Sequence, residues 1–282
     1  MFPRISLLCL CVIAVFSLTL VPDQAFAFTS MGAQIAQTTP EQLRRVEPPN
    51  PSATAQELER RGDELRYYKF YADAGDYYLA AIAKHDSAVV RNKLGIAELN
   101  MMRYRDSKKA FERAIKLDNH YAEAFNNLGV IYYADDHNNR KAIRNYEKAI
   151  KLNDQMASFY SNLGTALFAS RKYEKATQEY QRAMEIDPTI FEHHSRFGTT
   201  ANLTPADRGQ FAFTIAKLYL HSGDIQHCLL YLRKAQEEGI KISQKLASDP
   251  AFHGYQNDPR FVAVVRHEAI AEAPDPRLPD PR

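Results

Sequence analysis

Residues 122–156 read AEAFNNLGVIYYADDHNNRKAIRNYEKAIKLNDQM, and this stretch decides how the chain folds. Its central glycine, Gly129, lies in a segment that otherwise has the composition of a helix. A glycine in a helix interior costs about 1 kcal/mol relative to alanine, so its presence there needs a reason. Since Ala142 and Ala149 follow with the ring of Tyr146 between them, the stretch predicts two helices that approach closely around one aromatic ring.

The same arrangement recurs along the chain at a nearly fixed period. Glycines separated by 33, 34 and 35 residues are each followed by a small residue, an aromatic ring and an alanine. The glycines are Gly62, Gly95, Gly129 and Gly164; the small residues are Ala74, Ser107, Ala142 and Ala176; the rings are Tyr78, Phe111, Tyr146 and Tyr180; the alanines are Ala81, Ala114, Ala149 and Ala183. Such a period is typical of stacked helical hairpins, in which each unit packs only on its neighbours.

The motif FNNLGVIY at 125–132, followed by AIRNYEKA at 142–149, resembles the tetratricopeptide repeat. So does YSNLG at 160–164, followed by ATQEYQRA at 176–183 and a closing proline. The resemblance implies an all-α fold, a right-handed superhelical solenoid of antiparallel helix pairs. It specifies the fold better than it specifies a function, because such a scaffold serves many functions.

Four units of this kind follow one another, and the extra residue of the third lies in its turn. The units are 55–87, 88–121, 122–156 and 157–190. A fifth, degenerate unit fits 209–242, where Ala216 replaces the glycine. The early units depart from the family pattern: Arg61 and Arg91 stand where an apolar or aromatic residue is preferred, and Glu98 stands where the third unit has Tyr132.

The first 27 residues have the layout of a secretory signal peptide. Arg4 precedes an apolar or small run from Ile5 to Val21, a polar break follows, and Ala25-Phe26-Ala27 offers the small residues that a signal peptidase reads. The run falls just short of the roughly 20 residues needed for a membrane-spanning helix. We therefore expect export to the periplasm or the extracellular space. The alternative is a protein anchored in the membrane by an uncleaved signal.

Three further segments separate or flank the repeats. The Gln-, Thr- and Pro-containing stretch 28–54 predicts a flexible linker. Residues 191–208 form an insertion, interpreted as a loop that leads into a long helix from about Pro205 to Ser222. The Pro-rich tail 273–282 is expected to be disordered.

Residues 243–272 contain an Asp-Pro-x-Phe doublet, DPAF at 249–252 and DPRF at 258–261. In each, the aspartate can cap a helix, the proline can open it, and the phenylalanine can turn inward. A solenoid needs a terminal element that covers its last apolar face. We expect this segment to be that C-terminal cap.

The composition excludes several classes of protein. With 45% hydrophobic and 25% charged residues the bulk of the chain is not intrinsically disordered, and a net charge of +2 leaves no general excess of positive charge for nucleic acid. No Gly-rich phosphate loop, metal-binding cysteine pair or nucleophile elbow is present in the sequence. We therefore expect no enzymatic activity, cofactor or metal. The less favoured interpretation, an enzyme or metal-binding protein, would depend on His193 and His194.

The predicted second helices of the repeats carry many basic residues with interspersed glutamates. A solvated face of mixed sign is the favoured interpretation. A site for an anionic surface is the alternative.

In the family, the first helices of successive units line a concave groove that holds a peptide. Carried onto this chain, the groove positions are Asn92, Ile96 and Leu99, then Asn126, Val130 and Tyr133, then Ser161, Thr165 and Phe168. The lysine of the family's carboxylate-gripping version is absent, because its place is taken by Glu59, Asn92, Asn126 or Ser161. We therefore expect an extended or helical partner segment with apolar side chains rather than an acidic C-terminal tail.

These features together predict an exported scaffold that binds another polypeptide in the groove. The alternative is a structural spacer or assembly factor of an envelope complex, which would use the outer face or the 191–208 loop. Nucleic acid is not an expected partner, and the membrane is one only if the N-terminal segment is not cleaved.

Overall fold

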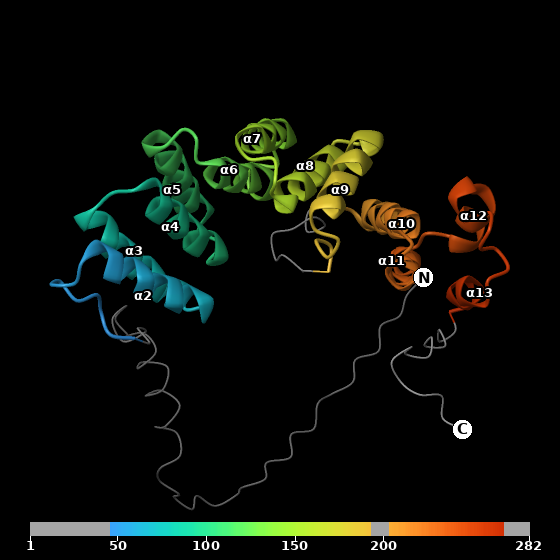
Figure 1. The fold of residues 1–282 in the computed structure, drawn as a ribbon, viewed down its shortest axis with the longest axis horizontal. Coiled ribbons are helices and arrows are strands. Elements are labelled where there is room, and N and C mark those ends of the chain that lie inside the picture. The colour runs from blue at the N-terminus through green and yellow to red at the C-terminus, as the bar shows by residue number, and fades with distance from the viewer. Residues whose placement is uncertain (1–45, 193–202, 268–282) are drawn as a thin grey trace, which may run out of the picture. The chain divides into compact units, whose positions relative to one another are not determined.

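The computed structural model describes residues 46–192 and 203–267, which form twelve α-helices and one short 3-10 helix (Figure 1). No strand occurs in these two ranges. The predicted signal peptide, most of the predicted linker, residues 193–202 of the insertion and the Pro-rich tail lie outside the described residues.

Four helix pairs follow one another from residue 55 to residue 186. They are α2 (Ala55–Tyr67) with α3 (Tyr71–Lys84), α4 (Ala88–Asn100) with α5 (Tyr104–Leu117), α6 (Ala122–Ala134) with α7 (Asn139–Leu152), and α8 (Ala157–Ala169) with α9 (Tyr173–Ile186). Within each pair the helices pack along each other, and the second helix of a pair packs on the first helix of the next. The predicted all-α solenoid of helix pairs is therefore confirmed.

The recurring glycines lie where a ring of the second helix crosses the first helix. A Cβ atom added to Gly129 would lie 2.6 Å from an edge carbon of Tyr146, and the same holds within 0.1 Å for the other three glycines. The four rings are at most 2% exposed, and they belong to Tyr78, Phe111, Tyr146 and Tyr180. Because no side chain fits in that space, the prediction that glycine allows close approach around a ring is confirmed.

The small residues on the second helices complete this contact. Ser107 is fully buried, and its hydroxyl donates to the carbonyl oxygen of Gly95 at 2.8 Å. The later alanine of each unit is also 0% exposed, in the order Ala81, Ala114, Ala149 and Ala183. The small residues of the second helix therefore let it lie close to the first helix, beside the ring.

A fifth pair consists of α10 (Pro205–Ser222) and α11 (Ile225–Glu237). The helix predicted at 205–222 is confirmed, and it begins four residues before the predicted start of the fifth unit at 209. Thr204 caps it, since its side chain accepts a hydrogen bond from the backbone N–H of Asp207. Ala216 stands at the glycine position and Leu232 at the ring position, and both are 0% exposed.

The chain continues into α12 (Ile242–Ser248), the 3-10 helix η2 (Pro250–Phe252) and α13 (Pro259–Val265). Asp249 and Asp258 each accept a backbone hydrogen bond at the start of a helix, as the side-chain cap that the doublet predicts. Phe252 and Phe261 are fully buried, and the ring of Phe252 lies 5.6 Å from that of Phe213 on α10.

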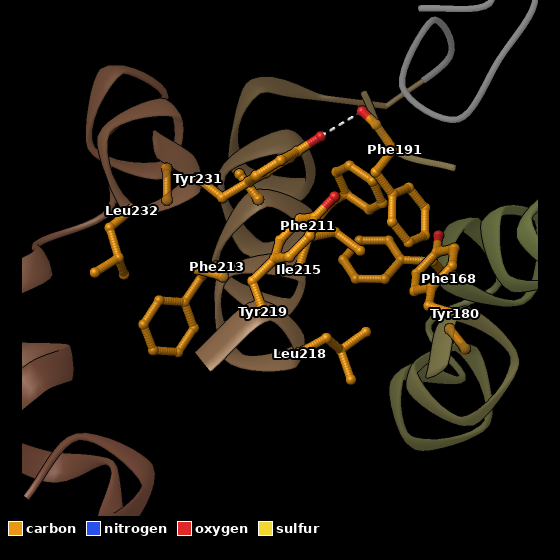
Figure 2. Packing of buried hydrophobic residues seen from close by; sticks show 14 of the residues in the cluster. Phe168, Tyr180, Phe191, Phe211, Phe213, Ile215, Leu218, Tyr219, Tyr231 and Leu232 are labelled. Atoms are coloured by element: carbon orange, nitrogen blue, oxygen red, sulfur yellow. Dashed lines mark hydrogen bonds between the residues drawn. The ribbon is translucent and has the colours of Figure 1, made fainter. Parts of the chain in front are cut away.

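The largest group of contacting buried residues runs from Tyr133 to Val264. Its centre is a set of rings from α8, α9, α10 and the residues after α9, in which Phe211 lies 6.0 Å from Phe168 and 5.4 Å from Tyr180 (Figure 2). The hydroxyl of Tyr231 donates to the carbonyl oxygen of Phe191 at 2.7 Å, so α11 also holds the chain that leaves α9 (Figure 2). Across the described ranges, every helix is too short or too polar to span a bilayer.

Candidate binding face on the first helices

Four asparagines link α4, α6 and α8 side by side, and we call them the amide ladder: Asn92, Asn126, Asn127 and Asn162. Asn127 donates to Asn92 across the first step, and Asn162 donates to Asn126 across the second, both at 2.9 Å. Within α6, Asn126 donates to Asn127 at 3.2 Å, which joins the two steps. Three successive first helices therefore share one chain of side-chain hydrogen bonds.

The position of each amide follows from its distance to the repeat glycine. Asn92 and Asn126 lie three residues before a glycine, whereas Asn127 and Asn162 lie two residues before one. Consecutive side chains on a helix point about 100° apart, so the two kinds face different neighbours. The repeat period then brings the second amide of one helix to the first amide of the preceding helix.

The ladder keeps hydrogen-bonding capacity for a ligand. A side-chain amide offers two N–H donors and two acceptor lone pairs, and the ladder bonds use only part of that number. Asn92 and Asn126 are 4% and 7% exposed, but Asn127 and Asn162 are only half-buried. The oxygen of Asn162 accepts no hydrogen bond from any residue in the described ranges. Donors and acceptors therefore reach solvent along this face.

An ionic cluster continues the row of first helices toward the N-terminus. The Nζ atom of Lys93 on α4 donates to Glu59 and to Asp63 on α2, each at 2.6 Å. Burial opposes the charged form of Lys93, but the bonds to the two carboxylates outweigh it and raise the pKa of this lysine. Lys93 is thus charged and already paired with two carboxylates of this chain.

The nine predicted groove residues fall into different environments. Leu99, Tyr133 and Phe168 are 7%, 4% and 1% exposed and lie in the packing between successive pairs. Phe168, for example, contacts Phe211 of α10 edge to face at 6.0 Å (Figure 2). These three side chains serve the core in this structure, so a ligand would meet the other predicted residues first.

The remaining predicted residues frame the ladder. Ile96 and Val130 are half-buried and lie one helical turn after Asn92 and Asn126. Ser161 and Thr165 are buried on α8, where the Thr165 hydroxyl donates to the Ser161 carbonyl oxygen at 2.9 Å. The accessible lining is therefore amide and aliphatic, and the aromatic part that the sequence predicted lies beneath it.

Three further residues that could carry chemistry are His193, His194 and Cys228. His193 and His194 lie outside the described residues, and within 46–192 and 203–267 no group of three or more His, Cys, Asp or Glu side chains could hold a metal ion. Cys228 is fully buried, and burial raises the pKa of its thiol to about 12. At neutral pH this thiol stays protonated and is no nucleophile.

Comparison with known proteins supports the repeats. Residues 92–136 and 131–189 match the family model described as tetratricopeptide repeat, which confirms the predicted repeats in that part of the chain. No curated protein matches the chain.

Several solved structures are similar to the chain at low identity. The crystal structure of MamA is 22% identical, with 63% of this chain and 93% of that chain covered and a TM-score of 0.44. PilF of Pseudomonas aeruginosa is 17% identical, with 72% and 81% covered and a TM-score of 0.47. YrrB, described as a tetratricopeptide-repeat protein with an unusual peptide-binding site, is 16% identical, with 77% and 94% covered and a TM-score of 0.44.

Proposed function

We propose that this chain, whose residues 92–189 carry tetratricopeptide repeats, is a non-enzymatic scaffold that holds a segment of another polypeptide along α4, α6 and α8. The observation that carries the proposal is the amide ladder. Asparagine is a poor helix former, and burying its amide costs free energy unless hydrogen bonds replace those to water. Four such residues at the middle of three helices indicate a role beyond packing.

The ladder suits the main chain of an extended segment. Such a segment presents an N–H and a C=O at every residue, and a side-chain amide can bond to either group. Ile96 and Val130 lie four residues after Asn92 and Asn126, on the same side of their helices. We therefore propose that the amides bind the partner's backbone while Ile96 and Val130 contact its apolar side chains.

Site-specific photocrosslinking in the native host tests this proposal. The photoreactive residue p-benzoylphenylalanine replaces Val130 in one variant and Leu230, an exposed residue of α11, in the control. We expect a polypeptide adduct from position 130 and none of the same mass from position 230.

The ladder is then removed in the same background. Asn127→Ala with Asn162→Ala should abolish the adduct while the helical circular dichroism signal is retained. An adduct that persists in this double variant would reject the ladder as the binding element. Adducts that form only from position 230 would favour the spacer function that uses the outer face.

We also propose that the chain is exported, on the strength of the signal layout in residues 1–27. The mass of the chain purified from its host distinguishes the two fates of this segment. Cleavage after Ala27 removes the segment, and the expected protein begins at Phe28. An intact chain that resists extraction from membranes would instead establish the anchored form.

A further inference from the structure

Positive charge is concentrated on two neighbouring second helices. Helix α5 contains five basic and two acidic residues, and α7 contains five basic and one acidic residue. The next second helix, α9, has two basic and three acidic residues. Because the whole chain carries only +2, this concentration is local.

Ion pairs offset the charge on α5 but leave that on α7. On α5, Lys108 pairs with Asp136 at 2.9 Å, and Arg113 pairs with Asp86 at 2.7 Å. On α7, all five basic side chains are exposed, and none forms an ion pair with an acidic residue of the described ranges. They are Arg140, Lys141, Arg144, Lys148 and Lys151. The face of mixed sign expected from the sequence therefore describes α5 and α9 better than α7.

The unpaired cations form a stripe along α7. Arg140, Arg144 and Lys148 follow one another at intervals of four, and Lys151 comes three residues later, so all four lie on one side of the helix. The stripe is roughly 16 Å long, since a helix rises about 1.5 Å per residue. Like charges four residues apart destabilise a helix, and the single acidic residue of α7, Glu147, which lies three residues after Arg144 and four before Lys151, offsets them only in part. A rule of local stability broken in this way points to a functional surface.

We propose that this stripe, which we call the α7 stripe, docks an acidic segment of another polypeptide. Its two arginines can bind carboxylates in a bidentate manner, and its lysines supply further charge-assisted hydrogen bonds. The ammonium group of Lys148 also lies over the ring of Phe125 on α6, 5.7 Å from the ring centroid, which places this charge by a cation–π contact. The partner is thus a narrow segment that presents several carboxylates.

The neighbouring helix favours a polypeptide over a flat anionic membrane. Glu179 of α9 is close enough to Glu147 of α7 that the pKa of Glu179 is raised, by its burial first and by Glu147 second. A membrane that approached α7 would also meet the glutamates of α9 and be repelled by them. A segment one helix wide that follows α7 meets only the one carboxylate of that helix, Glu147.

The α7 stripe is independent of the amide ladder, since the ladder lies on the first helices α4, α6 and α8. The inference therefore goes beyond the proposed function, and either one can fail while the other holds.

Fluorescence anisotropy with the full chain tests the inference. The probe is a fluorescein-labelled glutamate-rich peptide of about ten residues, long enough to span the stripe when extended. We expect saturable binding that weakens as salt is raised, because salt screens exposed charges. Arg140→Gln with Arg144→Gln and Lys151→Gln should weaken binding at least tenfold. The control, Lys172→Gln with Lys175→Gln and Arg182→Gln at α9, removes the same charge and should change binding less than twofold.

The remaining outcomes decide against the inference. Equal loss in both triple variants would mean that net charge alone attracts the probe. Binding to phosphatidylserine vesicles without binding to the peptide would assign the stripe to a membrane surface. No binding of either probe would leave α7 as a solvated face. Circular dichroism checks that the α7 variant stays folded, and Arg144→Glu alone should also weaken binding.

Discussion

At the scale of single residues, one missing carbon atom sets the distance between the helices of a pair. The ring of Tyr146 occupies the place where a Cβ of residue 129 would be. The fifth pair fills this contact differently, with Ala216 in place of the glycine and Leu232 in place of the ring. Compared with the other pairs, the fifth pair has one more carbon atom on its first helix and no aromatic ring at this place on its second helix.

This exchange predicts a coupling between Gly129 and Tyr146. Gly129→Ala alone should destabilise the protein by about 1–3 kcal/mol, because it overpacks the contact with the ring. Tyr146→Leu alone should destabilise it by leaving a cavity. The double variant recreates the Ala216–Leu232 pair, and urea denaturation should show it at least about 1 kcal/mol more stable than the sum of the single effects. Strict additivity would mean that the ring and the glycine do not constrain each other.

Glu98 predicts a pH dependence of stability. Glu98 is only 9% exposed, and its buried Oε2 atom makes no hydrogen bond within the described ranges. Burial raises the pKa of Glu98, although Arg103 at 3.5 Å partly opposes this. Because the pKa of Glu98 in the folded state lies above the ordinary value of 4.5, ionised Glu98 opposes folding. The protein therefore loses stability as the pH rises from 4.5 through the folded-state pKa.

Glu98→Gln should therefore raise the melting temperature at neutral pH. The gain should vanish well below pH 4.5, where Glu98 is uncharged in both the folded and the unfolded state. Thermal unfolding at the two pH values measures this. The exposed Glu112 supplies the control, because Glu112→Gln should change little at either pH. A gain of equal size at both would point to packing rather than to charge.

The residue-level predictions from sequence differ in quality for a physical reason. The glycines and rings could be predicted because a repeated helix penalty at a fixed period requires a shared explanation. The burial of Phe168 could not, because Phe211, which covers it, lies beyond the insertion and outside the repeat period. Nor could the amide ladder, since it depends on which side of each helix meets its neighbour.

At the scale of secondary-structure elements, the C-terminal segments complete the core of the fifth pair. Phe252 and Phe261 lie 6.2 Å apart, and Lys217 of α10 pairs with Asp249 at 2.7 Å. Two short helices of seven residues and one 3-10 turn therefore stay folded through tertiary contacts rather than through their own length. The doublet made the starts of η2 and α13 predictable, because aspartate and proline act locally.

Removal of the Phe261 ring should loosen the packing of the C-terminal segments around Phe252 and Tyr255. We expect Phe261→Ala to destabilise the protein by about 3–5 kcal/mol, in the range of buried aromatic truncations. Leu230→Ala on α11 is the matched control, since Leu230 is 44% exposed and should contribute little. Chemical denaturation of both variants measures the difference, and similar small losses would show that the C-terminal segment is dispensable for the fifth pair.

The backbone conformation of the turns inside the pairs could not be predicted from the sequence. Lys69, Met102 and Arg171 each adopt a positive φ between 60° and 64° at the same place in their units. The fifth pair has Gly223 there, with a φ of 84°. A residue with a positive φ is usually glycine. Because three of these turns have a lysine, a methionine or an arginine there, their sequences do not indicate this conformation.

At the scale of the folded part of the chain, stability is unevenly distributed. One continuous set of buried contacts extends from Tyr133 to Val264. The first pair, by contrast, leaves Tyr67, Tyr68 and Leu79 exposed at 81%, 66% and 49%. Within the described residues the first pair packs on only one other pair, and since each pair in a solenoid is stabilised mainly by its neighbours, it should open most easily.

Native-state hydrogen exchange should therefore proceed fastest in α2 and α3 and slowest in α8 and α9. Mass spectrometry of peptides from each pair, over a time course at neutral pH, gives the order. Uniform protection from residue 55 to residue 237 would mean that the pairs unfold as one cooperative unit.

The contacts along the row of first helices change in kind, from carboxylates around Lys93 between α2 and α4 to amides between α4, α6 and α8. Dissolved ions weaken the first kind and leave the second almost untouched. Concentrated salt should thus weaken the contact between α2 and α4, while the asparagine contacts between α4, α6 and α8 keep their hydrogen bonds, so the array can be loosened at its first pair alone.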